Sequence, residues 1–431
     1  MGVSRHSAAR IYNLFPRLAG PMDKWPHFFD RARELGFRWV YINPFHYPGF
    51  SGSLYAVKDY FRLNPLFVPR TWGQADDQRR YLSRLVSEAS RRGLALMMDL
   101  VINHTAKDSL LVEEHPEWFV RDADGRIKSP SAIDPADARR VTVWGDLAEV
   151  NNRDAPNREE LWAFWEYLVA YYAEVGFRGF RCDAAYQVPA ELWRRLIRKA
   201  RSIDPQCLFF AETLGCRLEE VQQLAEAGFD LIANSSKWWN FSEPWCLEQH
   251  RLFRSVAPSV SFPESHDTPR LASETGGLQC VQEQRYVFAA AFSGAVLMPV
   301  GYELGFRRKL DVVNTKPEDW EEPLFDISGV VRALNDLKAR IPVLGAEGRT
   351  EAVWGLEGPV LCLRKEENGQ ALLIVVNKDW HNAHDVAVGD LDRLLPGPER
   401  TCLWPQEAPR PTGSSWSFRL GPAEVALLAA S

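Results

Sequence analysis

Two acidic residues stand where they can act as a nucleophile and a proton donor. Asp183 follows Arg181 by two residues, so their side chains share one face of an extended segment. A guanidinium beside a carboxylate favours its charged form and keeps its pKa low, as a nucleophile requires. Glu212 follows the apolar residues Leu208–Ala211, and an apolar neighbourhood raises the pKa of a carboxyl group, as a general acid requires.

A third acidic residue, Asp267, follows Ser265 and His266. The tripeptide suggests a Ser-His-Asp hydrolase triad. However, consecutive residues of an extended chain point to opposite faces and cannot form that relay, so we discard the triad. We expect the negative charge of Asp267 to lie near Glu212 and to help keep that acid protonated near neutral pH.

These residues belong to four short segments that follow one another in a fixed order. The segments are 99–104 (DLVINH), 179–183 (GFRCD), 210–212 (FAE) and 265–267 (SHD). Each resembles one of the four signature segments of the α-amylase family, glycoside hydrolase family 13. One fragment can occur by chance, whereas four in order indicate the family.

The resemblance implies retaining cleavage of an α-glycosidic bond. Asp183 is then the nucleophile and Glu212 the general acid/base, two carboxyl groups that a retaining enzyme holds about 5 Å apart. Asp267 is the third catalytic carboxylate. It is expected to bind two adjacent sugar hydroxyls more tightly as the ring flattens in the transition state.

The family resemblance also implies a set of substrate contacts. Tyr55 and Asp59 lie in a segment similar to the family's Tyr-x-x-x-Asp-Tyr motif, whose first Tyr stacks on the sugar at the cleavage subsite. His104, Arg181 and His266 are expected to contact substrate in the same subsite.

Two further residues receive supporting roles from the resemblance. Asp99 is expected to support the Arg181 region, and Asn103 is a candidate calcium ligand. Many α-amylases have Pro and Asp where this chain has Ala148 and Glu149, and many have Lys-His within the stretch that here reads 184–188 (AAYQV). These departures weaken the expectation of bound calcium, and we expect that no cofactor is required.

Other segments resemble bacterial maltosyltransferases of the same family, namely 43–48 (NPFHYP) and 114–119 (EHPEWF). Maltosyltransferases that use maltose 1-phosphate typically carry Asn directly after the nucleophile and lack the His before the third carboxylate. The corresponding residues here are Ala184 and His266. We therefore expect an uncharged glucan donor.

The function predicted from these residues is a retaining α-glycosidase acting on α-1,4-glucan or malto-oligosaccharides. A transglycosylase of the maltosyltransferase or glucanotransferase type uses the same covalent intermediate, so the sequence leaves hydrolysis and transfer open. An alternative from another class is a non-catalytic glucan-binding barrel. Such proteins usually lose their catalytic carboxylates, and this chain keeps all three.

The elements that must position these residues alternate between apolar β-like runs and segments of helical period, as in a (β/α)8 TIM barrel. The expected strands are 10–15, 39–43, 95–100, 179–182, 208–211, 230–233, 259–262 and 296–299. The expected helices include 75–92, 158–175, 189–203, 281–292 and 330–339. Each signature segment then falls at the C-terminal end of a strand, where barrel enzymes gather their catalytic groups.

The same pattern predicts three parts. The catalytic barrel comprises 1–104 and 157–342, and 105–156 forms a small insertion after the third strand, similar to the B domain of the α-amylase family. From 343 to 431 the pattern changes to short strands, such as 360–364 and 371–377, which predicts a C-terminal β-sandwich domain.

Composition limits the partners. The chain has 431 residues, of which 46% are hydrophobic and 25% charged, with a net charge of -6 that disfavours nucleic acid. The longest near-apolar run, 287–300, is too short to span a membrane. Seven scattered cysteines and an N-terminus without an apolar stretch favour the cytoplasm. We expect an α-glucan or malto-oligosaccharide ligand, and the oligomeric state stays open.

Overall fold

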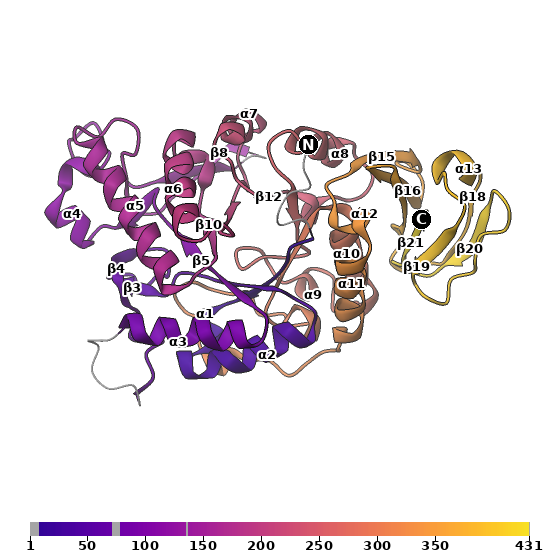
Figure 1. Ribbon diagram of the computed structural model, residues 1–431, viewed down its shortest axis with the longest axis horizontal. Helices are drawn as coiled ribbons and strands as arrows, with labels where there is room; N and C mark the ends of the chain where they lie inside the picture. Colours follow the sequence, from indigo (N-terminus) through magenta and orange to yellow (C-terminus); the bar gives the residue numbers. More distant parts are fainter. Residues whose placement is uncertain (1–7, 71–77, 135–136, 431) are drawn as a thin grey trace.

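The computed structural model describes residues 8–70, 78–134 and 137–430 (Figure 1). Eight parallel strands close into a barrel in the order β1-β14-β13-β12-β11-β10-β5-β2. They are β1 Arg10–Leu14, β2 Trp39–Ile42, β5 Ala95–Leu100, β10 Gly179–Cys182, β11 Leu208–Ala211, β12 Leu231–Ala233, β13 Ser259–Ser261 and β14 Ala295–Pro299. The predicted TIM barrel is confirmed.

The strand bounds differ from the predicted ones by a residue at several ends, for local reasons. β1 ends at Leu14 because Pro16 opens a short helix and Phe15 is its N-cap. Asp230 lies outside β12, where its carboxylate binds the guanidinium of Arg201 at 2.7 Å and accepts the Phe209 amide at 2.8 Å. Phe15 and Asp230 both continue an extended sequence pattern, but Pro16 ends β1 before Phe15, and the contacts of the Asp230 carboxylate leave β12 to begin at Leu231.

The barrel has an inner and an outer apolar layer. The inner core includes Ile11, Met97, Phe210 and Val260, all at most 4% exposed, so side chains fill the barrel. Gly179 is needed on β10 because a Cβ there would lie 2.9 Å from the Met97 side chain. The outer faces of the strands pack against the surrounding helices.

The long outer helices are α2 Trp25–Glu34, α3 Gln78–Arg91, α5 Arg158–Val175, α6 Ala190–Ile203, α10 Gln279–Phe292 and α11 Ser328–Arg340. The start predicted for the second of these, 75–77, lies outside the described residues. α6 shows why such segments form helices here: Leu192, Trp193, Leu196, Ile197 and Ala200 recur at helical spacing and are all buried. Shorter helices are α1 Pro16–Ala19, α4 Leu110–Glu114, α7 Leu218–Gln222, α8 Trp245–Phe253, α9 Leu271–Glu274, α12 Pro342–Gly345 and α13 Leu391–Leu394.

Two excursions extend the barrel after its second and third strands. After β2, a hairpin forms from β3 His46–Pro48 and β4 Val57–Leu63. After β5, β6 His104–Ala106 pairs with β9 Leu147–Glu149, and β7 Ser131–Asp134 pairs with β8 Asp137–Val143. The loop predicted as a small insertion therefore has strands of its own, while its domain boundaries stay a prediction.

The C-terminal region is a five-stranded antiparallel sheet in the order β15-β16-β17-β21-β19, with a two-stranded sheet of β18 and β20 on one face. The strands are β15 Arg349–Trp354, β16 Val360–Glu367, β17 Gln370–Asn377, β18 His384–Val388, β19 Arg400–Trp404, β20 Trp416–Leu420 and β21 Val425–Ala430. Figure 1 shows this region, in yellow, beside α10, α11 and α12. Leu372 and Ile374 join the core shared with the barrel, whereas Leu373 and Val375 face β18 and β20, which explains the unbroken apolar run of β17.

The membrane and cysteine expectations can be compared with the described residues. None of the helices in residues 8–70, 78–134 and 137–430 is long and apolar enough to cross a bilayer. All seven cysteines are free thiols.

Candidate active site

The four signature segments end on one rim of the barrel. In the parallel ladder, Arg181 pairs with Asp99 on one side and with Phe210 on the other, and Cys182 pairs with Ala211. Asp183 and Glu212 directly follow β10 and β11, so they lie beside each other at the C-terminal ends of neighbouring strands. The Glu212 amide donates to the carbonyl of Cys182 at 3.0 Å, which extends the pairing into the site.

Arg181 joins two carboxylates. Its Nη1 donates to Asp183 Oδ1 at 2.6 Å and to Asp99 Oδ1 at 3.0 Å, and its side chain is 6% exposed. Asp99 Oδ2 also accepts from Tyr41 and Tyr55 hydroxyls at 2.5 and 2.7 Å. Burial raises the Asp99 pKa to about 6, although Arg181 opposes that shift. The contact predicted between Asp99 and Arg181 is present, and it fixes the guanidinium that faces Asp183.

The enclosed position of the Glu212 carboxyl group raises its pKa to about 7. Burial is the main cause. Arg181 opposes it, Asp183 adds to it, and Asp267 makes a smaller contribution in the same direction. Both carboxyl oxygens accept backbone amides: Oε2 from Ala184 at 2.9 Å and Oε1 from Leu214 at 2.6 Å. The group is thus held in one orientation with its proton affinity tuned near neutrality.

Asp267 lies on a bend after β13 and its side chain is 59% exposed. Its Oδ2 lies 3.1 Å from His266 Nε2, which also lies 2.7 Å from the hydroxyl of Tyr55. The argument that consecutive residues face apart was therefore wrong for His266 and Asp267, because this segment is a bend and not a strand. These three side chains still do not form the Ser-His-Asp relay, because His266 Nε2 contacts Asp267 and Tyr55, while Ser265 Oγ accepts a hydrogen bond from the Asp267 amide at 3.3 Å.

Similar proteins share both the sequence pattern and the fold. The model of the glucanotransferase domain of glycogen debranching enzyme matches residues 5–121. An α-1,4-glucan:maltose-1-phosphate maltosyltransferase of Burkholderia pseudomallei is 29% identical over 90% of this chain and 35% of its own length. A maltogenic α-amylase of Bacillus acidopullulyticus is 23% identical over 81% of this chain and 61% of its own. These matches support an α-amylase family protein related to maltosyltransferases.

The α-amylase fold extends over the whole chain. The crystal structure of an α-amylase from Lactobacillus plantarum superposes with a TM-score of 0.78 at 20% identity, covering 100% of both chains. The curated relatives are longer: this chain spans 35% of the Burkholderia protein and 58% of a maltosyltransferase from Rhodospirillum rubrum, which is 26% identical.

The remaining residues expected to bind substrate differ in the contacts that their side chains already make within the protein. His104 Nε2 is buried without a protein partner, and burial lowers the His104 pKa, so a neutral imidazole is available to a ligand. The Tyr55 ring stacks on the His266 ring with centroids 5.7 Å apart. Asp59 turns back onto its own strand, where Oδ1 accepts the Phe61 amide at 2.9 Å. His104 Nε2 is thus free for a ligand and Tyr55 contacts His266, whereas the Asp59 carboxylate is bonded within its own strand.

Asn103, the candidate calcium ligand implied by the α-amylase family, keeps one buried oxygen, Oδ1, without a hydrogen-bond partner. Its Nδ2 donates to Gln187 Oε1 at 3.2 Å, and Glu149 binds the ammonium group of Lys128 at 2.8 Å. Calcium prefers six to eight oxygen ligands with several carboxylates. Within the described ranges, no three His, Cys, Asp or Glu side chains gather as a metal site. We derive no step through calcium.

Sequence reasoning missed two supporting residues on β2 and just after it. Tyr41 donates to Asp99, and Asn43 Nδ2 donates to the hydroxyls of Tyr41 and Tyr55 at 3.1 and 3.0 Å. Their spacing of two on a predicted strand was a usable signal, because it places both on the inner face. Together they fix the Tyr55 hydroxyl beside Asp99 and His266.

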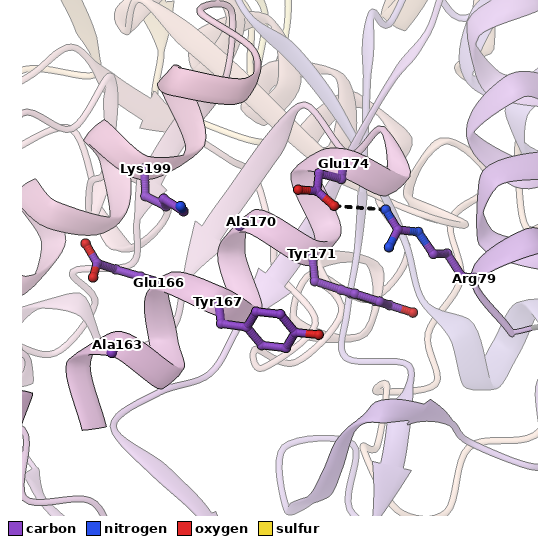
Figure 2. A pocket seen from close by; sticks show the side chains of 8 residues that line it. All are labelled: Arg79, Ala163, Glu166, Tyr167, Ala170, Tyr171, Glu174 and Lys199. Atoms are coloured by element: carbon purple, nitrogen blue, oxygen red, sulfur yellow. Dashed lines mark hydrogen bonds and ion pairs between the residues drawn. The ribbon is translucent and has the colours of Figure 1, made fainter. Parts of the chain in front are cut away.

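A hollow of about 320 Å³ lies elsewhere, on the outer wall formed by α3, α5 and α6 (Figure 2). Tyr167 and Tyr171 lie in its middle, with Arg79 and Lys199 at opposite ends. None of the predicted site residues lines it, and Arg79 is already paired with Glu174 at 3.0 Å. The chemistry of the α-amylase family therefore belongs to the barrel rim and not to this hollow.

Proposed function

We propose that this protein is a retaining enzyme that cleaves α-1,4-glucans or malto-oligosaccharides through a glycosyl-enzyme intermediate on Asp183. One observation carries the proposal. Asp183, bound by Arg181 at 2.6 Å, and Glu212, whose pKa is raised to about 7, directly follow the paired residues Cys182 and Ala211 on neighbouring strands. A retaining mechanism needs one such nucleophile beside one such acid.

The reaction follows from these two groups. A carboxylate oxygen of Asp183 attacks the anomeric carbon while Glu212 donates its proton to the glycosidic oxygen, whose bond to that carbon breaks. Glu212, now ionised, then takes a proton from water as the water oxygen attacks the anomeric carbon and releases Asp183. Two displacements restore the α configuration. Asp267 and His266, whose side chains approach each other to 3.1 Å, are expected to hold sugar hydroxyls.

The test is product analysis. The protein is incubated with maltose through maltoheptaose, the products are separated by chromatography, and the anomer formed first is read by NMR. Shorter α-configured oligosaccharides are the expected products. A folded protein that turns over none of a panel of α-glucosides would favour the non-catalytic glucan-binding barrel.

Transfer to a sugar hydroxyl is the second candidate, and the names of the relatives favour it. The matching domain is a glucanotransferase, and relatives from Burkholderia, Rhodospirillum and Myxococcus xanthus are maltosyltransferases. A sugar hydroxyl would then replace water in the second displacement. Products longer than the substrate identify transfer in the same chromatogram.

The donor is proposed to be an uncharged glucan rather than maltose 1-phosphate. A buried phosphate needs several hydrogen-bond donors, and the Ala184 side chain offers none directly after the nucleophile. A phosphate site could otherwise come from Lys58 or from a residue of the insertion 105–156, and Lys58 is paired with Asp108 at 2.9 Å. Phosphate release from maltose 1-phosphate with glucan as acceptor, faster than maltoheptaose cleavage, would overturn this choice.

A further inference from the structure

Two adjacent tryptophans follow β12 on the catalytic rim, and they have opposite surroundings. Trp239 is fully buried among Phe241, Phe288 and Phe292. Trp238 is 51% exposed. The core explains Trp239, whereas nothing in the packing requires a large aromatic ring in solvent at position 238.

The exposed ring is nevertheless held in place. Trp238 stands edge-on to Phe262, with centroids 6.3 Å apart and planes at 89°. The ammonium group of Lys237 lies 5.8 Å from the Trp238 ring centroid, and it is itself anchored to Glu274 at 2.9 Å with a side chain only 4% exposed. A ring fixed before a ligand arrives loses little conformational entropy on binding.

The segment that carries the ring neighbours the segment that carries Glu212 at the barrel mouth. β12, which precedes Trp238, neighbours β11, which precedes Glu212. The Thr213 hydroxyl, next to Glu212, donates to the carbonyl of Ala233 at the end of β12 at 2.6 Å. Phe262 belongs to the inner barrel core, and Leu214 packs against the same core. The segments that carry Glu212 and Trp238 therefore converge on one apolar base.

We propose that Trp238 is a platform for the sugar on the leaving-group side of the cleaved bond, and for the acceptor sugar where the enzyme transfers. The inference rests on the proposed function, because Glu212 protonates the leaving oxygen and so places the leaving sugar on its own side. Aromatic rings suit this role because the C–H faces of a sugar pack on them.

The test compares Trp238→Ala with Trp238→Phe, which keeps a ring, and with Tyr167→Ala. Tyr167 is 60% exposed on the outer wall and is the matched control for loss of a surface aromatic. Trp238→Ala should lower kcat/KM for maltoheptaose on the order of tenfold, the size of one aromatic contact. It should also lower the ratio of transfer to hydrolysis. Trp238→Phe should recover most of both losses, and Tyr167→Ala should change neither.

A second donor separates binding of the leaving sugar from general damage. α-Maltosyl fluoride has no leaving sugar, so Trp238→Ala should lose much less activity on it than on maltoheptaose. Equal losses on the two donors, or the same kcat/KM for Trp238→Ala and Tyr167→Ala, would overturn the platform.

A binding measurement separates failure of the platform from failure of the proposed function. Maltoheptaose is titrated by calorimetry into Asp183→Asn with and without Trp238→Ala. Weaker binding in the double variant, on the order of tenfold, supports the platform even if the wild-type protein proves inactive. Unchanged binding together with normal wild-type turnover overturns the platform alone.

Discussion

The carboxylates of the rim that lie on or directly after strands are enclosed, whereas the carboxylate on a loop is exposed to solvent. Asp99 and Asp183, on or directly after strands, have side chains 0% and 13% exposed and share Arg181. Asp267, on a bend, is 59% exposed. Groups whose charge or proton must be controlled are enclosed and bonded, because a low effective dielectric strengthens every neighbour's influence. Asp267, the carboxylate proposed to hold sugar hydroxyls, stands open to solvent.

The largest expected effect tests the enclosed side of this comparison. Asp183→Asn removes the nucleophile and should lower kcat on the order of a thousandfold or more, because no covalent step remains. Steady-state kinetics on maltoheptaose measures it, with exposed Asp154→Asn as the control for loss of an aspartate. A β-anomer as the first product of the wild-type enzyme would contradict retention and with it this role.

The next effect concerns the proton on Glu212. Glu212→Gln should lose activity on maltoheptaose by roughly a hundredfold or more, the usual size of general acid catalysis. It should keep far more activity on an α-glycosyl fluoride, whose leaving group needs no proton. Kinetics on the two donors gives the comparison, and equal losses on both would argue against the acid role.

The enclosed half of the site was predictable from sequence. Strands such as Gly179–Cys182 and Leu208–Ala211 are short apolar runs, and the residues that end them meet on one rim of a parallel barrel. The positions of Asp183 and Glu212 on the rim therefore followed from strand ends, whereas their expected roles came from the resemblance of four ordered segments to the α-amylase family. The alternation of strands and helices predicted the barrel by the same reasoning.

The open half was less predictable because loops have no period. The contact of His266 with Asp267 depends on a bend, and strand alternation excluded it. Trp238 and Trp239 are adjacent and of the same residue type, yet one is solvent-exposed and the other buried, and only tertiary packing separates them. The backbone conformation of Ala184 could not be predicted either, because alanine rarely adopts the left-handed φ of 40° that it has here.

That backbone gives a third, smaller prediction. The conformation of Ala184 aims its amide at Glu212 Oε2, and a β-branched side chain is strained there. Ala184→Val should lower the free energy of unfolding by about 1 kcal/mol or more. Ala184→Asn should be tolerated, because Asn adopts this region readily. Urea unfolding measures the free energy of unfolding of both variants. Equal values for the two would mean that the backbone at position 184 adapts without strain.

The smallest effect tests the open carboxylate. Because the Glu212 pKa is raised to about 7, the acid is protonated below that pH, and kcat/KM should fall as pH rises through it. Asp267→Asn removes a charge that raises the Glu212 pKa, so the alkaline limb should move to lower pH, alongside a loss of rate.

The size of that movement separates the two causes of the Glu212 pKa. Burial outweighs Asp267 among the causes that raise the Glu212 pKa, so the loss of Asp267 should move the limb by less than the shift that burial produces. The control is Glu166→Gln, on the outer wall, which should leave the limb in place. A shift that returns the limb to the ordinary pKa of a glutamate, about 4.3, would make the open carboxylate the main cause and reverse the comparison.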